Sequence, residues 1–334
     1  MFIEFFLIFI LSLAFIKVIQ KYAVTWGLVD IPNDRSAHIN QTARGAGIGF
    51  YLAVVLVLTF FHLDLVLTYI WTFIAIFLVF AIGTLDDYKG TSPKVKFLVL
   101  IVATILICFD DILINNLGIF FGVDVSLGWF AIPFTVFAVV GFTNALNLID
   151  GLDGLSATVS IVILSTFFFV GYVNNDLFLM SISAAFIISL LAFLIYNWYP
   201  ASIFMGDSGS LTLGFVISIL AIKSLDYLPA ISIFFVTAIP LFDTLIVMIR
   251  RKRNGRSMFV ADSCHLHHIF KELFKESTRK TVLFLGVLQV GYSLVGLQFN
   301  KSIDEGFLLI LFIFNIVMLY LFLSSMIKKQ KRKC

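Results

Sequence analysis

The stretch Leu177–Tyr196 reads LFLMSISAAFIISLLAFLIY, a run of 20 residues without a charged side chain. The apolar core of a bilayer is about 30 Å thick, and a helix needs about 20 apolar residues to cross it. The same character extends along the chain, because 60% of its 334 residues are hydrophobic and only 13% are charged. In soluble domains about 45–50% of the residues are apolar and about 25% are charged. The composition excludes a soluble protein and predicts an all-α, polytopic membrane protein.

Similar apolar stretches recur along the whole sequence and predict about 10–11 transmembrane helices. The stretches are Phe2–Tyr22, Ala46–Leu63, Leu65–Thr84, Val95–Leu113, Trp129–Thr143, Leu155–Val173, Leu177–Tyr196, Ser210–Leu225, Leu228–Ile249, Thr281–Phe299 and Gly306–Ile327. No composition shift separates them, so residues 1–327 are expected to form one membrane domain. Residues 328–334 follow as a basic tail.

The positions of Lys and Arg predict the orientation, because cytoplasmic loops hold an excess of basic residues. With the N-terminus outside and the C-terminus in the cytoplasm, all but two of the 23 basic residues, Lys223 and Lys301, fall on the cytoplasmic side. Five cytoplasmic loops result, and they carry most of the polar residues that could do chemistry. The loops are Asp30–Arg44, Asp86–Lys94, Asn144–Asp153, Asn197–Asp207 and Arg250–Lys280.

A pair of carboxylates, Asp86 and Asp87, directly follows an apolar stretch. Adjacent carboxylates repel one another and gain stability from a cation, which makes this pair a candidate for binding Mg²⁺ or for handling a phosphate proton. A second pair, Asp110 and Asp111, lies one membrane span later and should face the opposite side. We interpret that second pair as a solvated helix end.

Four polar residues recur every third position in NALNLIDGLDGL, which spans 144–155. They are Asn144, Asn147, Asp150 and Asp153, and this spacing places them along one face of a helical segment. Gly151 and Gly154 beside the acids would let a ligand approach the backbone. The alternative is a polar stripe that pairs helices in the bundle. Two acids without a base in the same loop make that alternative costly.

The loop NWYPASIFMGDSGS, which starts at Asn197, places Asp207 between a glycine and small hydroxyl residues at a helix start. Such a carboxylate suits Mg²⁺, which takes oxygen ligands and keeps waters for substrate phosphates to displace. The string Gly-Asp-Ser-Gly is also found around serine-protease nucleophiles. That reading requires a histidine base and an acid against Ser208, and nothing in the sequence supplies them in a recognisable arrangement.

A histidine cluster, His265, His267 and His268, lies in the longest and most basic loop. Its neighbours Arg250–Arg256 supply positive charge and forked donors, so the cluster is suited to a diphosphate. Zinc is the alternative, although tetrahedral sites need a fourth ligand and helical sites favour an i, i+4 spacing. Arg44 in the first loop adds further positive charge to the same side. Asp243, inside an apolar stretch after Pro240, is interpreted as a supporting or helix-pairing group.

The four motifs together resemble the polyprenyl-phosphate N-acetylhexosamine-1-phosphate transferases, the glycosyltransferase family 4 superfamily that includes the lipid I-forming translocase. The resemblance runs in motif order from Asp30 to His268. The sequence HLHH at 265–268 is more like the branch that uses UDP-GlcNAc and related UDP-HexNAc sugars, because the translocase typically carries three consecutive histidines.

The resemblance implies a Mg²⁺-dependent enzyme, with Mn²⁺ as a substitute, in which Asp207 binds the metal. Catalytic roles fall to Asp86 and Asp87 on the polyprenyl-phosphate side and to the histidine cluster on the diphosphate side. Residues that match or adjoin the nucleotide-sugar pocket are Asn144, Asn147, Asp150, Asp153, Asn197, Phe204, Arg44 and Arg256.

The implied reaction transfers a HexNAc-1-phosphate, with GlcNAc-1-phosphate expected first, from a UDP-sugar to undecaprenyl phosphate and releases UMP. It would start a lipid-linked envelope glycan, as in lipopolysaccharide or cell wall synthesis, at the cytoplasmic face of a bacterial inner membrane. The expected partners are the two substrates and the bilayer, without nucleic acid, and a homodimer is common among relatives. The alternative is an ion-coupled transporter or a lipid flippase, whose acids should lie near the middle of the bilayer.

Overall fold

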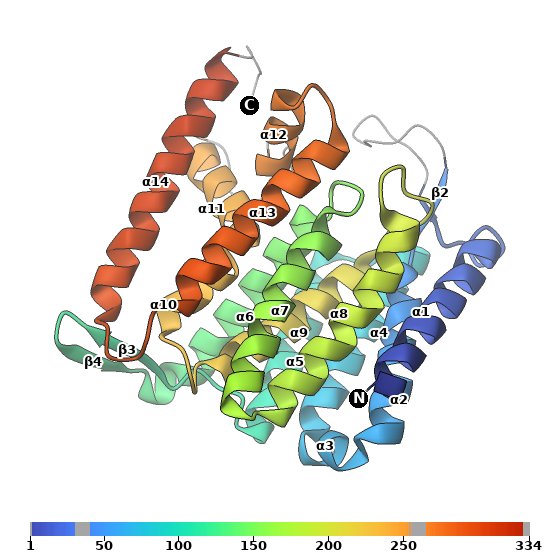
Figure 1. Cartoon of the computed structure of the whole chain (residues 1–334), viewed down its shortest axis with the longest axis horizontal. Coiled ribbons are helices and arrows are strands. Elements are labelled where there is room, and N and C mark those ends of the chain that lie inside the picture. Colours follow the sequence, from blue (N-terminus) through green and yellow to red (C-terminus); the bar gives the residue numbers. More distant parts are fainter. Residues whose placement is uncertain (1, 31–40, 254, 256–264, 330–334) are drawn as a thin grey trace.

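The computed structural model describes residues 2–30, 41–253, 255 and 265–329, and these form a bundle of long helices (Figure 1). The long helices are α1 (Phe2–Tyr22), α2 (Ala46–Phe61), α4 (Ile70–Lys89), α5 (Pro93–Ile107), α6 (Ala131–Ile149), α7 (Leu155–Asn174), α8 (Leu177–Asn197), α9 (Asp207–Ser224), α11 (Ala238–Arg253), α13 (Thr278–Leu297) and α14 (Glu305–Lys329). The shorter helices are α3 (Leu63–Thr68), α10 (Ala230–Val236), α12 (Leu266–Leu273) and two 3₁₀ turns, η1 (Cys108–Asp110) and η2 (Gly128–Phe130).

Each of the eleven predicted apolar stretches overlaps one or more helices, and the prediction of an all-α polytopic membrane protein is confirmed. The number of spans is smaller than predicted: within the described residues, eight helices are long and apolar enough to cross a membrane. A ninth span results if α10 and α11 are taken as one bent helix. The difference comes from α2 and α5, which have 16 and 15 residues. At 1.5 Å per residue they extend about 22–24 Å, less than the apolar thickness of a bilayer.

The stretch predicted as one helix from Leu228 to Ile249 is broken. Helices α10 and α11 meet at an angle of 88°. Pro240 explains the break, because it has no N–H to donate to the carbonyl of Val236 four residues earlier. Gln289 of α13 supplies the missing donor, since its Nε2 lies 2.7 Å from that carbonyl and its Oε1 accepts from the N–H of Ile239 at 3.0 Å.

Two small antiparallel sheets were not predicted. Strands β3 (Asn116–Phe120) and β4 (Val123–Ser126) form a hairpin at one end of the bundle, and α12 lies at the other end (Figure 1). Strands β1 (Val29–Asp30) and β2 (Thr42–Ala43) pair near the end of α1. The chain after β2 continues beside the chain that precedes α9, because Ala46 N–H bonds to the carbonyl of Phe204 at 3.1 Å.

Helix α9 lies at the centre of the bundle and is buried along most of its length. Glycines let α2 and α4 approach its first turn closely. A Cβ added at Gly83 of α4 would lie 2.5 Å from the carbonyl oxygen of Asp207, and one added at Gly47 of α2 would overlap the backbone of Gly209. Backbone contacts of this kind fix where α9 begins relative to α2 and α4. They therefore fix the position of Asp207, its first residue.

Candidate active site

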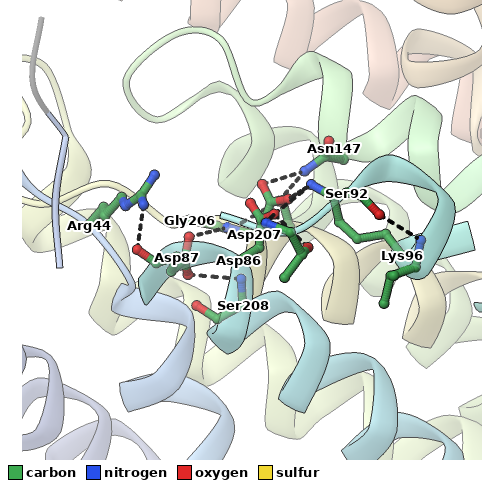
Figure 2. A network of polar contacts seen from close by, with 12 residues as sticks. Arg44, Asp86, Asp87, Ser92, Lys96, Asn147, Gly206, Asp207 and Ser208 are labelled. Atoms are coloured by element: carbon green, nitrogen blue, oxygen red, sulfur yellow. Dashed lines mark hydrogen bonds and ion pairs between the residues drawn. The ribbon is translucent and has the colours of Figure 1, made fainter. Parts of the chain in front are cut away.

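Asp87 binds the N-terminus of α9. Its carboxylate accepts hydrogen bonds from the backbone N–H of Asp207 at 2.8 Å and of Ser208 at 3.0 Å (Figure 2). A carboxylate at this position satisfies amides that a helix leaves without partners and interacts favourably with the helix dipole. The side chain is 1% exposed, and Arg44 donates a hydrogen bond to the backbone carbonyl of the same residue. Asp87 thus joins the end of α4 to the start of α9.

Asp86 points to the opposite side of this junction and takes part in a row of charges. Its Oδ1 accepts hydrogen bonds from the N–H and the hydroxyl of Thr91, and it lies 3.0 Å from the ammonium of Lys96. The same ammonium lies 2.8 Å from Oδ2 of Asp207 (Figure 2). One lysine therefore bridges two carboxylates that are 121 positions apart in the chain. Each of the three side chains keeps 16–24% of its surface exposed.

Asn147 completes the contacts of Asp207. Its Nδ2 donates to Oδ1 of Asp207 at 3.1 Å and to the hydroxyl of Ser210 at 2.8 Å. Asn144, one turn earlier on α6, donates to the carbonyl of Val140. Both asparagines line a cavity of ≈180 Å³ that begins next to Lys96. Its other lining residues are Pro93, Phe97, Leu100 and Leu211.

The two acids of the second motif do not share a helix face, because α6 ends at Ile149. Asp153 accepts a hydrogen bond from the N–H of Ala201 at 2.9 Å. Asp150 is half-buried, and its carboxylate has no hydrogen-bond partner within the described residues. Burial, followed by repulsion from Asp207, Asp87 and Asp153, raises the pKa of Asp150 well above its usual 3.8. The carboxylates around Asp150 therefore carry more negative charge than the nearby groups balance.

Two residues predicted to line the nucleotide-sugar pocket are engaged in holding loops together. Asn197 is buried, accepts from the N–H of Gly154 at 2.8 Å and donates to the carbonyl of Ile203 at 2.9 Å. The N–H of Phe204 bonds to the carbonyl of Ala43 at 2.8 Å. These bonds place the segment before α9 beside the loop that contains Asp150. The substrate contacts proposed for both residues stay predictions.

The histidine cluster begins α12 and faces a carboxylate of α11. Nδ1 of His265 lies 2.6 Å from Oδ2 of Asp243, and Nδ1 of His267 lies 3.3 Å from Oδ1. The rings of His267 and His268 are 4.3 Å apart between centroids. A Cβ added at Gly151 would lie 2.7 Å from Nε2 of His267, so the cluster reaches the loop of Asp150. Arg256 lies outside the described residues.

The structure therefore brings Asp86, Asp87, Asn147 and Asp207 together and places the histidines against the neighbouring loop. Sequence reasoning missed Lys96, for which the only signal was a charged residue in the first turn of an apolar helix. The separation of the two acid pairs is confirmed, because Asp110 bonds to the N–H and hydroxyl of Thr72, at the other end of α4 from Asp86. Asp110 is not simply solvated, however, since it binds the first turn of α4.

Comparison with known proteins places the chain in a class. A model of the family described as glycosyl transferase family 4 matches residues 69–225, which include the acid pair, the asparagine motif and Asp207. The chain belongs to this family, as its similarity to full-length relatives also shows.

The individual relatives are bacterial proteins named as transferases. A protein of Bacillus subtilis (strain 168) named as a probable undecaprenyl-phosphate N-acetylglucosaminyl 1-phosphate transferase is 34% identical over 308 residues, which are 90% of this chain and 85% of that protein. An undecaprenyl-phosphate alpha-N-acetylglucosaminyl 1-phosphate transferase of Yersinia pestis is 30% identical over 78% of this chain and 74% of its own. A phospho-N-acetylmuramoyl-pentapeptide-transferase of Listeria monocytogenes is 40% identical over 45% of this chain and 50% of its own.

Proposed function

We propose that the protein transfers N-acetylglucosamine 1-phosphate from UDP-GlcNAc to undecaprenyl phosphate and releases UMP. The observation that carries the proposal is the row Asp86, Lys96 and Asp207, with Asn147 bound to its last member. The names of the relatives supply the acceptor, undecaprenyl phosphate, and the transferred group, N-acetylglucosaminyl 1-phosphate. In the reaction, an oxygen of the lipid phosphate attacks the sugar-linked phosphorus. The bond to the bridging oxygen breaks, and this oxygen leaves with UMP.

The donor atoms at the site fit a divalent cation. Asp207 offers a partly exposed carboxylate, and the carboxylate of Asp150, which has no hydrogen-bond partner among the described residues, lies close enough to interact with it electrostatically. All these donors are oxygens, which Mg²⁺ prefers. Asp207 would hold the ion, with Asp150 as a second carboxylate, and the bound ion would neutralise charge on the diphosphate.

The chain's own residues position the substrates and balance their charge, which is most of what phosphoryl transfer needs. The ammonium of Lys96 lies between the two carboxylates and can turn to a phosphate oxygen. Asp87 is already bound to the amides of Asp207 and Ser208, so its role is to hold α9 in place. A phosphate monoester has a second pKa near 6, so the acceptor is already largely anionic at pH 7. Removal of its proton is therefore a small part of the task.

The lipid phosphate is proposed to enter through the ≈180 Å³ cavity between α5, α6 and α9. Lys96, Asn144 and Asn147 form its polar part, and Phe97, Leu100 and Leu211 form its apolar part. This arrangement matches a ligand with a charged head and a hydrocarbon chain.

We also propose that this end of the bundle faces the cytoplasm of a bacterial inner membrane, in a single catalytic domain spanning residues 1–327. The basic residues Arg250–Arg253 at the end of α11 support that orientation, since cytoplasmic loops are rich in Lys and Arg. A transporter would place its acids near the middle of the bilayer. Here Asp86, Asp87 and Asp207 lie at helix ends.

The test is UMP release by purified protein with undecaprenyl phosphate, Mg²⁺ and a panel of UDP-sugars. We expect release with UDP-GlcNAc and a loss of at least about 100-fold in Asp207→Asn, because a positioned charge in an active site contributes about that much. The matched control is Asp111→Asn, at an exposed position with φ 57° that asparagine tolerates. Equal loss in both variants would contradict the placement of the site. No release with any sugar, together with passage of substrate across vesicles, would favour transport.

A further inference from the structure

Asp243 is a fully buried acid that the proposed reaction leaves unused. It lies on α11, one residue after Phe242, and its side chain is 0% exposed. Its two carboxylate oxygens go to different histidines, Oδ2 to His265 and Oδ1 to His267. A carboxylate in this environment is stable only when it is paired and hydrogen-bonded. The two histidines are its partners.

The pairing fixes which ring nitrogen of each histidine carries a proton. An ionised carboxylate only accepts hydrogen bonds, so both Nδ1 atoms must donate. The Nε2 atoms then face away from Asp243. A histidine held in this way by a carboxylate has a set tautomer and ring orientation.

The Nε2 of His267 is aimed at the loop that joins α6 to α7. The side chain of His267 is 1% exposed, and its Nε2 has no hydrogen-bond partner in the part of the chain that the structure describes. A Cβ added at Gly151 of this loop would lie 2.7 Å from the nitrogen. Gly151 directly follows Asp150, so this nitrogen lies beside the proposed substrate site. A buried nitrogen without a partner costs free energy unless a ligand satisfies it.

We propose that Asp243 is a positioning residue that holds His265 and His267 by their Nδ1 atoms and presents Nε2 of His267 to a diphosphate oxygen of the nucleotide sugar. The inference rests on the proposed function, since it names a partner for that same site. To donate to a phosphate oxygen, Nε2 must carry a proton, and the ring is then an imidazolium. The carboxylate of Asp243 stabilises this cation, so the buried pair remains compatible with an anionic substrate.

A metal ion is the competing occupant of this cluster, because the ligand atoms of Asp243, His265 and His267 lie within 4.8 Å of one another. The 2.6 Å separation between Nδ1 of His265 and Oδ2 of Asp243 is close to the length of a charge-assisted N–H···O hydrogen bond, about 2.7–2.9 Å. A metal at 2.0–2.2 Å from both atoms would instead require the proton to leave Nδ1. The geometry therefore favours the hydrogen-bonded pair.

The test uses Asp243→Asn in the purified full chain, with Thr244→Val as control. Both substitutions are isosteric and adjacent on α11, and the hydroxyl of Thr244 is buried without a hydrogen-bond partner in the described residues. An asparagine has a single acceptor oxygen in its side chain. It can therefore accept from one Nδ1–H, whereas the two oxygens of aspartate accept from both histidines. We expect kcat for UMP release to fall about 10- to 100-fold in Asp243→Asn, the usual effect of removing a carboxylate that orients a histidine, and to stay within about twofold in Thr244→Val.

Two further measurements separate positioning from a loss of fold. In protein labelled with ¹⁵N-histidine, the wild type and Thr244→Val should show two downfield Nδ1–H signals, of which Asp243→Asn loses at least one. In a double-mutant cycle, Asp243→Asn should add little to the effect of His267→Gln, because both act through the same ring.

Independent effects of the two substitutions, or equal kcat in Asp243→Asn and Thr244→Val, would overturn the inference. So would stoichiometric zinc in the wild type that Asp243→Asn lacks. A wild type that shows the two Nδ1–H signals but releases no UMP would refute the proposed function and, with it, the diphosphate as the partner of His267.

Discussion

At the end of the bundle that carries the β3–β4 hairpin, carboxylates are matched to backbone amides. Glu305 accepts from the N–H of Ala230 and of Ile231, and Asp304 accepts from the N–H of Phe121 and of Gly122. The N–H of Phe121, followed by other nearby amides, holds the pKa of Asp304 below its usual value. Asp304 is thereby stabilised as an anion, and the hydrogen bonds of both acids close loops.

At the other end of the bundle, one carboxylate is also bound to two backbone amides, but the other carboxylates of the proposed site are not. Asp87 is matched to two amides of α9, as Glu305 is to two amides of α10. Asp86 and Asp207, however, share one lysine, and Asp150 is left without a partner within the described residues. An excess of like charge, and not the presence of acids as such, therefore distinguishes the end that carries the proposed site.

The largest effect is expected from a methyl group at the α4–α9 contact. In Gly83→Ala the new Cβ would lie 2.5 Å from the backbone oxygen of Asp207, so α9 must shift and carry the carboxylate with it. We expect UMP release to fall at least about 100-fold, because errors of about 1 Å in positioning cost that much. The control is Gly141→Ala on α6, where a Cβ meets nothing within 4 Å. Similar loss in both variants would mean that the glycine contact does not position the site.

Removal of the shared cation should have the next largest effect. Lys96→Met leaves Asp86 and Asp207 facing one another without the ammonium that lies 2.8–3.0 Å from both. We expect kcat/KM for UMP release to fall about 10²–10³-fold, as when one preorganised charged donor is removed. Lys94→Met, on an exposed position of the same turn, should retain activity. A wild-type rate in Lys96→Met would mean that the ion pairs of this lysine are structural and do not contribute to the reaction.

The sequence allowed the helices and the start of α9 to be predicted, because both depend on local signals. Apolar length identifies the spans, and Gly206 before Asp207 identifies the helix start. Lys96 could not be recognised, because its two partners come from other elements and only the packing of α4 against α9 brings them together. The break between α10 and α11 had a local signal in Pro240. The spacing of Asn147 and Asp150 was misleading, since the helix that would align them ends at Ile149.

A smaller effect is expected from replacing Asp150 in the metal-free protein. The pKa of Asp150 is raised in the folded state, so folding favours its protonated form. The contribution of this group to stability is complete below pH 3.8 and is lost as the pH rises through the higher pKa of the folded state. Asp150→Asn should therefore melt about 2–4 °C higher than the wild type at pH 7 in EDTA, for a gain of about 1 kcal/mol.

The same variant should release UMP more slowly, because it lacks a carboxylate beside the proposed cation. The melting temperature of the wild type should fall as the pH rises above 3.8 through the raised pKa of Asp150, and that of the variant should change less. Identical pH profiles in a fluorescence melting assay would contradict the view that this end holds excess negative charge.

The smallest effect on activity is expected at the hairpin end. Glu305→Gln replaces a carboxylate that binds two amides at the start of α10, and a neutral amide can accept only through its single oxygen. The loss of a charged cap costs about 0.5–2 kcal/mol, so the melting temperature should fall by a few degrees. Because Glu305 caps a helix and contacts none of the proposed site residues, UMP release per folded molecule should match the wild type. A large loss of turnover without a loss of stability would show that charge at this end also serves catalysis, and the contrast between the two ends would fail.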